Sequence, residues 1–455
     1  MKKKKHLSST KLIPLSFLAA IVVGTLLLML PICSAAGTFT DPLTALFTAT
    51  TSVCVTGLVV VDTYSYYSTV GHAVILFLIQ IGGLGIITVA SILMVIMRRH
   101  FTMGDRLMLM DALNLNTSKG VLSMLRRIFK GTFLIEGLGA ALYCIEFIPR
   151  FGVGRGIWVS VFNSISAFCN AGIDILGPDS LASYNDNPLV LCVTMGLIVL
   201  GGLGFVVWFD ITSTVRNNIK KRYRLSNLWK RLTEHTKLVL VLTLSLILAG
   251  AVFIFANEYN NPATIGNMPL SLKVCNSFFE SITLRTAGFS SFSQKGLTDI
   301  SCVGSYFLMF IGGSPIGTAG GIKTVTFFLA CMNVFTYIAD DRKNLLFKKY
   351  VTPALMRKAS VIVSVSVTTM IIMSLLLLAT NPVVIEDGIF EVVSATATVG
   401  LTRDLTSSLN TAGKIIIIIS MYLGRIGPIS MAIFFAARKP RRDSLRYAEG
   451  EFFVG

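Results

Sequence analysis

Four glycines recur along the chain at nearly constant spacing, and the two residues before each of them carry no charge. The spacings are 115, 116 and 112 residues, and the glycines are Gly57, Gly172, Gly288 and Gly400. A phenylalanine lies ten residues before each of them, at Phe47, Phe162, Phe278 and Phe390. In a neutral segment such as TTSVCVTGL (50–58), main-chain carbonyls are the groups that can hold an ion, because they can replace the hydration shell of a cation. Glycine suits this task because it adopts positive φ without strain, so that successive carbonyls can face one axis.

The elements that must position these glycines are membrane helices. Hydrophobic residues make up 53% of the 455-residue chain, charged residues only 14%, and the mean hydropathy is +0.72. Soluble domains carry about 25% charged residues, whereas a membrane span needs about 20 consecutive apolar residues. Apolar runs of this kind lie near residues 12–30, 72–97, 128–148, 188–209, 238–256, 303–338, 359–379 and 413–437. The sequence therefore predicts an all-α integral membrane protein, in which the first run is a retained helix and not a signal peptide.

The net charge of +17 follows the expected membrane topology and does not indicate nucleic acid binding. Lys and Arg gather near both ends of the chain and in the loops near 98–130, 216–237 and 340–358. Carboxylates outnumber them in the segments between. The positive-inside rule places both termini in the cytoplasm and gives eight crossings. The acidic excess on the outer face would attract cations there.

Each glycine segment lies between two apolar runs, which predicts one unit four times: outer spanning helix, short re-entrant pore helix, extended glycine segment, inner spanning helix. A second glycine-rich point follows within each inner run, at IGGLG (81–85), LGGLG (200–204), IGGSPIGTAGG (311–321) and LGRIGP (423–428). Close helix packing is the simpler explanation of the first two. Non-helical backbone at membrane depth must be satisfied by protein or by a water-filled cavity, so we expect the four segments to converge on one central pore. The units are predicted at 1–97, 98–215, 216–339 and 340–455.

The sequence lacks the patterns typical of enzyme active sites. It has no Walker A, HExxH or GxSxG motif, and neither its eight cysteines nor its four histidines show metal-ligand spacing. No cofactor is therefore expected. A membrane enzyme and a purely structural membrane protein are the weaker alternatives, because neither requires four neutral backbone segments.

With these motifs the chain resembles the Ktr/Trk/HKT superfamily of potassium transporters, most closely the membrane subunits of bacterial Ktr systems. The resemblance covers nearly the whole chain and rests on VTGLVVVDT (55–63), IQIGGLG (79–85), FCNAGI (168–173), RTAGF (285–289), GGIKT (320–324), TVGLT (398–402), TAGK (411–414), GRIGP (424–428) and the closing RYAEGEFFVG. It implies four membrane–pore–membrane repeats around one pore, and a homodimer in the plasma membrane of a bacterium. It also implies a cytosolic octameric ring of RCK-type (KtrA-like) subunits, which alone would bind ATP or ADP. K⁺ would be the substrate and Na⁺ an activator; a Trk-type or Na⁺-selective member of the superfamily is the alternative.

The resemblance implies a selectivity filter whose main-chain carbonyls hold K⁺. Its positions here are Val55, Thr56, Gly57, Asn170, Ala171, Gly172, Thr286, Ala287, Gly288, Thr398, Val399 and Gly400. Glycine at the last position of all four segments favours K⁺, because in plant relatives a serine at the first of these glycines goes with Na⁺ preference. Cys54 stands where related sequences more often carry threonine, which leaves the selectivity detail open.

The resemblance also implies a gate in the third inner helix, with Lys323 and Arg425 beside it. The loop positions are Gly312, Gly313, Ser314, Pro315, Gly317, Thr318, Gly320 and Gly321. Five glycines and a proline do not sustain a helix, whatever the family. A charge at the bilayer centre costs about 2.5–3.5 kcal/mol, so Arg425 should face the interior, where it would obstruct the pore until it moves with the loop. The alternatives are a structural ion pair of Arg425 with Glu136 or Asp210, and a Lys323 that snorkels to the inner surface.

The remaining candidates are carboxylates and basic loops. Asp62, Asp174 and Asp404 follow filter segments and either form a cation-attracting vestibule or are ordinary loop acids. Glu280 and Glu391 lie in pore helices and are predicted to support the filter backbone by hydrogen bonds. The basic cytoplasmic loops either contact anionic membrane lipids or dock on the partner ring. The apolar end EFFVG is a candidate subunit contact.

Overall fold

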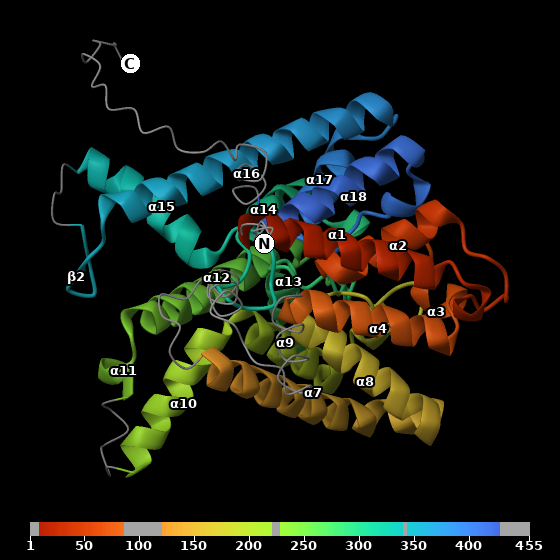
Figure 1. Ribbon diagram of the computed structural model, residues 1–455, viewed down its shortest axis with the longest axis horizontal. Helices are drawn as coiled ribbons and strands as arrows, with labels where there is room; N and C mark the ends of the chain where they lie inside the picture. Colours follow the sequence, from red (N-terminus) through yellow and green to blue (C-terminus); the bar gives the residue numbers. More distant parts are fainter. Residues whose placement is uncertain (1–8, 86–120, 221–227, 340–343, 428–455) are drawn as a thin grey trace, which may run out of the picture.

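The computed structural model describes residues 9–85, 121–220, 228–339 and 344–427 (Figure 1). The apolar runs predicted near 72–97 and 413–437 lie partly outside these residues, as do parts of the basic loops, and the closing EFFVG lies wholly outside them. The described part is mostly helical, with one short antiparallel hairpin. The all-α class predicted from the sequence is therefore confirmed.

The helices follow the chain in four groups. The first group contains α1 (Ser9–Leu28), α2 (Pro42–Cys54), α3 (Thr63–Tyr66) and α4 (Thr69–Leu84). The second contains α7 (Val121–Phe151), α8 (Val153–Cys169), α9 (Pro188–Gly202) and α10 (Phe205–Lys220). The third contains α11 (Leu228–Arg231), α12 (Glu234–Glu258), α13 (Leu270–Thr283), α14 (Asp299–Phe310) and α15 (Thr324–Ile338). The fourth contains β1 (Leu345–Leu346), β2 (Lys349–Tyr350), α16 (Pro353–Thr380), α17 (Ile385–Ala397) and α18 (Thr411–Ile426).

The helix that follows each glycine segment begins with a capping side chain. In α4, α9, α14 and α18 this residue accepts a hydrogen bond from a main-chain N–H in the first turn, and the four caps are Ser68, Asn187, Thr298 and Asn410. Such caps satisfy donors that a helix start otherwise leaves without a partner. The local sequence thus sets where all four helices begin.

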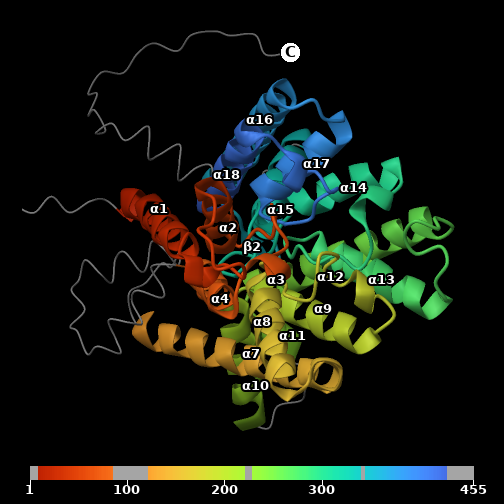
Figure 2. The same cartoon turned by 90° about the vertical axis from the view of Figure 1, so that its right-hand side faces the viewer.

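The four groups pack around a common centre. Figure 2 shows them following one another around it, from red and orange through yellow and green to blue. Each group contacts the next one in sequence, and the fourth contacts the first. The contacting pairs are α4 with α8, α9 with α13, α14 with α17, and α18 with α2. This arrangement brings together the segments that follow α2, α8, α13 and α17.

Fewer helices have full spanning length than the eight crossings predicted. In the described part, three are long and apolar enough to cross a membrane: Ser123–Phe151, Glu234–Glu258 and Pro353–Thr380. The pair α9 and α10, bent by 95°, makes a fourth if it is one span. Helices α14 and α15 are shorter because the loop after Phe310 divides the run 303–338, and α4 and α18 are shorter because their runs extend beyond the described residues.

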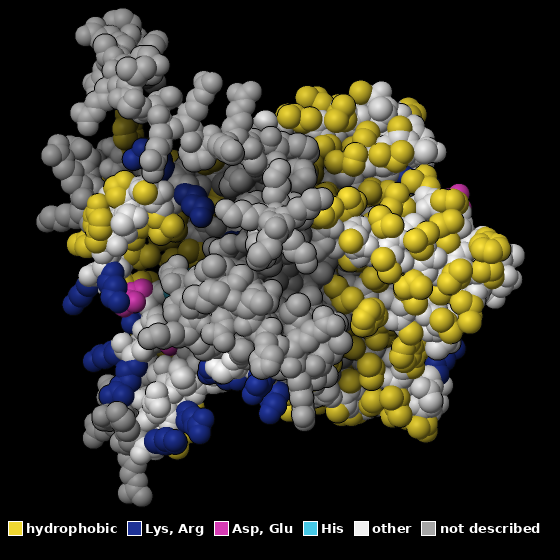
Figure 3. Space-filling model, in the orientation of Figure 1, with side chains coloured by type: hydrophobic (Ala, Val, Ile, Leu, Met, Phe, Trp, Pro, Cys, Tyr) yellow, Lys and Arg dark blue, Asp and Glu magenta, His cyan; other side chains and the backbone are white. Residues whose placement is uncertain are grey.

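The surface is apolar over much of its extent. Figure 3 shows hydrophobic side chains covering one part of the molecule and Lys and Arg gathered at the opposite end, where α10 and α11 lie. Leu26, Phe77 and Leu375 are each more than half exposed. Contiguous exposed apolar surface of this kind is typical of contact with lipid. The protein is therefore a membrane protein.

Candidate functional site

The four repeated glycines meet in a closed ring. A Cβ atom added to any of them would lie within 2.7 Å of a main-chain oxygen in the next segment, in the pairs Gly57 with Ala171, Gly172 with Ala287, Gly288 with Val399, and Gly400 with Thr56. The order of these contacts runs from the first segment to the fourth and back to the first. Segments more than a hundred residues apart therefore share one centre that has no room for a side chain at these positions.

The backbone of these segments is held in a rarely populated conformation. Each glycine has positive φ, and so does the residue two positions before it: Val55 (55°), Asn170 (59°), Thr286 (70°) and Thr398 (51°). Positive φ is costly for β-branched residues, which three of these four are. Strain of this kind persists only where surrounding structure enforces it, and it gathers at functional sites. All twelve residues predicted as filter positions lie in these segments.

Side-chain hydroxyls in the preceding helices hold the segments in place. The amides of Gly57 and Gly400 donate to the hydroxyls of Thr51 and Ser394, at 2.9 and 3.0 Å. In the other two segments the hydroxyls donate to main-chain oxygens after the glycine, in the pairs Ser166 with Ile173 and Thr283 with Phe289. Sequence reasoning missed these four residues, although a Ser or Thr six positions before the glycine in three segments was a visible signal.

The third segment is offset by one residue from the others. Phe47, Phe162 and Phe390 are fully buried, but in α13 the fully buried residue is Phe279 and Phe278 is only partly buried. The supporting hydroxyl of Thr283 likewise lies five residues before Gly288, not six. The assignment of Phe278 as the equivalent phenylalanine is therefore wrong in three dimensions. The cap of α13 explains the offset, since Leu284 is right-handed where the caps of α2, α8 and α17 are left-handed.

The glycine-rich motifs within the inner apolar runs (81–85, 200–204 and 423–428) combine close packing with the end of a helix. Gly82, Gly201 and Gly424 lie so near the carbonyls of Val53, Phe168 and Thr396 that none has room for a Cβ atom. Three residues later the chain turns to positive φ at Gly85, Gly204 and Gly427. The expected packing role is thus present, but the helices do not continue through these points as predicted.

The loop between α14 and α15 is unwound, as five glycines and a proline predict. The amide of Ser314 donates to the carbonyl of Gly202 at 2.9 Å, and that of Thr318 donates to the carbonyl of Gly201 at 3.2 Å. The carbonyl of Pro315 lies against Gly204, where an added Cβ would be 2.5 Å away. The loop is therefore docked on the end of α9.

The same loop touches two of the glycine segments and the end of α8. The Thr318 hydroxyl donates to the carbonyl of Phe168 at 2.9 Å and lies 3.4 Å from the side-chain oxygen of Asn170. Gly320 lies against the hydroxyl of Thr398 so closely that it has no room for a side chain. The loop thus lies against the second and fourth segments.

The side chain of Arg425 binds main-chain oxygens of the loop and of α4. Its Nη1 donates to the carbonyl of Thr318 at 2.8 Å, and its Nη2 donates to the carbonyl of Gly82. In the described residues it makes no salt bridge. Glu136 instead accepts from Gln80 at 3.1 Å, and Asp210 accepts from Thr233, so the alternative ion pair of Arg425 with either acid is wrong for this arrangement.

Lys323 also points to the loop and not to the inner surface. Its Nζ donates to the carbonyls of Ala319 and Gly320, at 2.6 and 3.3 Å. The snorkelling alternative is not supported by these contacts. The two cations therefore hold the second half of the loop from different sides.

The outer acids have structural partners. Asp62 caps α3, and Asp174 accepts from the amide of Leu176 at 3.1 Å. Burial raises the pKa of Asp174 to about 6, and the neighbouring charge of Asp62 adds to the effect. Asp404 is exposed and has positive φ (62°).

The glutamates of α13 and α17, Glu280 and Glu391, are buried and bind side chains. Glu391 accepts hydrogen bonds from the hydroxyls of Thr402 and Thr406, and Glu280 accepts from Gln294 at 3.3 Å. Both sets of donors come from the chain after the glycine segments. The hydrogen bonds of these acids therefore brace the chain that leaves each glycine segment, which is an indirect form of the support predicted from the sequence.

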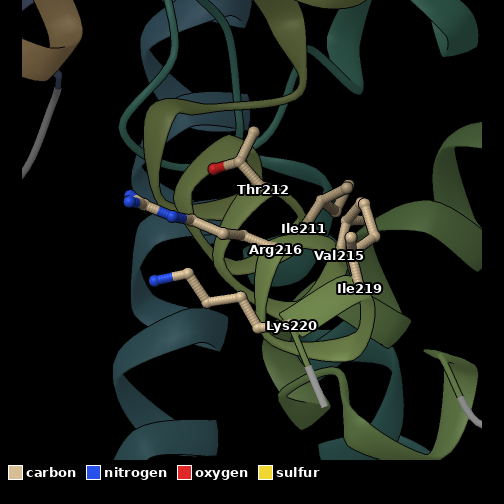
Figure 4. Close-up of a pocket in the computed structure, with 6 residues that line it drawn as sticks. All are labelled: Ile211, Thr212, Val215, Arg216, Ile219 and Lys220. Atoms are coloured by element: carbon tan, nitrogen blue, oxygen red, sulfur yellow. The ribbon is translucent and has the colours of Figure 1, made fainter. Parts of the chain in front are cut away.

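A hollow on the surface of α10 lies away from this centre. It has a volume of about 470 Å³ and runs along α10 (Figure 4). Ile211, Val215 and Ile219 form one side of it, and the long side chains of Arg216 and Lys220 extend on the other. It contains none of the predicted site residues.

Fold and site together define a helical membrane protein built around a central ring of four glycine segments. The chain matches the TrkH family model, described as a cation transport protein, over residues 8–447, and it belongs to that family. This match confirms the superfamily predicted from the motifs. Members of the family are transporters and not enzymes, as the sequence predicted for this chain.

Relatives with known names match over nearly their full length. The chain is 37% identical to the Ktr system potassium uptake protein B of Bacillus subtilis (strain 168), covering 98% of this chain and 96% of the relative. It is 35% identical to the potassium/sodium uptake protein NtpJ of Enterococcus hirae, covering 100% and 99%. Its fold resembles the crystal structure of the potassium transporter TrkH from Vibrio parahaemolyticus, with a TM-score of 0.74 at 14% identity, covering 95% of this chain and 86% of that one.

Proposed function

We propose that the chain is the ion-translocating subunit of a potassium uptake system. The observation that carries the proposal is the closed ring of four glycine segments, each with positive φ at its glycine and no charged side chain at its three predicted filter positions. Main-chain carbonyls in such a ring suit a weakly hydrated monovalent cation better than they suit an anion or an organic substrate. The names of the two relatives support K⁺ as that cation.

The finer architecture follows from the ring. The chain would consist of four membrane–pore–membrane repeats, at 1–97, 98–215, 216–339 and 340–455. The filter would be formed by the twelve positions given in the sequence analysis, with K⁺ on their carbonyls. Support comes from the four matching helix caps and from the closed order of contacts between the groups.

The gate would be the loop 312–321 with Lys323 and Arg425. Contacts of Thr318 and Gly320 with filter segments support a position below the filter. Arg425 would place a positive charge in the path of the cation and would leave it when the loop moves. The gate would respond to a cytosolic RCK-type ring, which alone binds ATP or ADP.

Assembly and location complete the proposal. The subunit would form a homodimer in the bacterial plasma membrane with both termini in the cytoplasm, and Na⁺ would stimulate transport. The gathering of Lys and Arg at one end of the molecule supports this orientation (Figure 3). The relatives' designation as Ktr system proteins supports a partner subunit. Arg216 and Lys220 of α10 suit either the acidic surface of that partner or anionic lipid headgroups (Figure 4).

Uptake by Gly57→Ser and Gly288→Ser variants tests the filter. Both substitutions should lower the ratio of K⁺ to Na⁺ uptake in a strain without other K⁺ transport, because each places a side chain at the ring. Gly196→Ser is the matched control, since Gly196 on α9 has no atom within 4 Å of an added Cβ. Unchanged selectivity in both filter variants would contradict the assignment.

A Na⁺-selective transporter is the second candidate. One relative is named a potassium/sodium uptake protein, and Cys54 departs from the residue more common in the superfamily. Competition between Rb⁺ and Na⁺ in liposomes, with and without the cytosolic partner, distinguishes the two candidates.

A further inference from the structure

A small cavity lies between the second and third groups of helices, beside the loop. Its volume is about 20 Å³. Ile198 and Val199 of α9 and Ile282 of α13 form an apolar part of its wall. Gly202, Thr243 on α12, Asn170 and Arg285 in two of the glycine segments, and Gly313 in the loop form the rest. Its position therefore joins two filter segments to the proposed gate.

Three buried hydrogen-bonding groups line this cavity without a partner among the described residues. They are Nε of Arg285, Nδ2 of Asn170 and the hydroxyl of Thr243. The three side chains are 8%, 1% and 8% exposed. Buried polar groups are nearly always satisfied, and each one left unpaired is costly. All three can donate a hydrogen bond, so the cavity suits a ligand that accepts.

The carbonyls of the cavity wall already have donors. The carbonyl of Val199 accepts from the amide of Leu203, and that of Gly202 accepts from Ser314. The carbonyl of Gly313 likewise accepts from the amide of Thr324 at 3.0 Å. A water molecule would bring two hydrogens that these engaged acceptors do not require. The hydrogen-bonding pattern thus favours a ligand without hydrogens.

The charge of Arg285 points in the same direction. Its guanidinium makes one hydrogen bond, from Nη2 to the carbonyl of Gly312 at 3.4 Å, and no salt bridge within the described ranges. A buried cation requires a compensating partner. Because a cavity of about 10–15 Å³ holds one water molecule, this one has room for one atom-sized ligand but not for a polyatomic ion.

We propose that this cavity binds a single chloride-sized anion, held by Arg285, Asn170 and Thr243. The anion fixes Arg285, which bonds to the start of the loop, and Asn170, whose side-chain oxygen lies against Thr318. Movement of the loop removes Gly313 from the cavity wall, so the anion favours the present arrangement of the loop. This effect on the gate rests on the proposed function, whereas the anion site does not.

Diffraction from the full-length protein crystallised in sodium bromide tests the site. We expect an anomalous bromide peak within hydrogen-bonding distance of Arg285 Nε, absent in Arg285→Gln and weakened in the near-isosteric Thr243→Val. Arg216→Gln, on the surface of α10, is the matched control and should keep the peak. Density without anomalous signal, or a peak of equal height in Arg285→Gln, would overturn the proposal.

Thermal unfolding in detergent gives a second measurement that does not depend on transport. Replacing gluconate by chloride at equal ionic strength should raise the melting temperature by about 2 °C in the wild type. Arg285→Gln should lose this rise, and Arg216→Gln should retain it. A wild-type melting temperature that is the same in both salts would count against the site, whatever the result of the uptake experiments.

Discussion

The guanidinium of Arg425 donates a hydrogen bond of 2.8 Å to the main-chain oxygen of Thr318. The hydroxyl of the same threonine donates to the carbonyl of Phe168 at 2.9 Å. One loop residue therefore connects α18 with the end of α8, and the third group of helices is held by the fourth and the second. Any movement of the loop must break both bonds.

Removing the side chain of Arg425 should make the loop easier to move. A hydrogen bond from a charged donor contributes about 1.5–3 kcal/mol, so Arg425→Ala should shift the loop equilibrium about tenfold or more toward release. We expect faster Rb⁺ flux into liposomes. Arg216→Ala, which removes an arginine from α10 without touching the loop, should leave flux unchanged. A loss of flux in a correctly folded Arg425→Ala protein would rule out an obstructing role.

Packing of α9 against α8 should not tolerate a methyl group at Gly201. An added Cβ there collides with the carbonyl of Phe168, whereas Gly196 on the same helix has open space. Overpacking costs about 1–3 kcal/mol, so Gly201→Ala should lower the melting temperature by several degrees and Gly196→Ala should not. Equal effects of the two substitutions on thermal unfolding would mean that α9 does not pack as described.

Thr406 supplies one of the two hydroxyls that satisfy the buried carboxyl group of Glu391. Thr406→Val preserves the shape and removes the donor, which should cost about 1–3 kcal/mol of stability. Ser408→Ala, on the exposed side of the same turn, is the control and should be nearly neutral. Chemical denaturation in mixed micelles measures both. If Thr406→Val is as stable as the wild type, Glu391 has another donor.

Stability should fall as pH rises through the range in which Asp174 ionises. This residue lies in the loop between α8 and α9, outside the spanning helices, and burial raises its pKa from 3.8 to about 6. Between these values the folded state binds more protons than the unfolded state, so the free energy of unfolding decreases from about pH 4 to pH 6 and stays lower above it. This difference between the unfolded and folded pKa values corresponds to a loss of about 3 kcal/mol in the free energy of unfolding.

Asp174→Asn provides the control for this pH dependence. The variant should be more stable than the wild type at pH 7.5 and similar to it at pH 4, with a flatter profile between. Melting temperatures of both proteins, measured from pH 4 to pH 7.5, test this prediction. Identical pH profiles would mean that another group causes the pH dependence.

The sequence predicted the ring of glycines because its cause is local. A segment that must turn to positive φ at Gly57 or Gly400 needs glycine wherever it occurs, so the requirement repeats in the sequence. The unwound loop was predictable for the same reason, since its glycines and proline exclude a helix by themselves.

Other features depend on contacts that the sequence does not display. The one-residue offset in α13 goes with the right-handed backbone of its cap residue Leu284, and the sequence alignment through Phe278 could not detect this conformation. The partners of Arg425 are main-chain carbonyls. Every residue carries a carbonyl, so the sequence could not show which ones bind Arg425, and a search for an acidic partner was bound to miss them. Helix ends at Gly85 and Gly204 were missed because glycine within an apolar run is equally consistent with close packing.

The closed order of the glycine contacts has a consequence for symmetry. Four identical chains around an axis would carry four copies of every residue, including four copies of the loop and of Arg425, which binds it. Here one polypeptide supplies all four sectors, and each sector has diverged: the third carries the unwound loop, the fourth carries Arg425, and the first two supply the surfaces to which these bind. A single covalent chain can thus keep four equivalent glycine segments while only the fourth sector carries Arg425, which binds the loop.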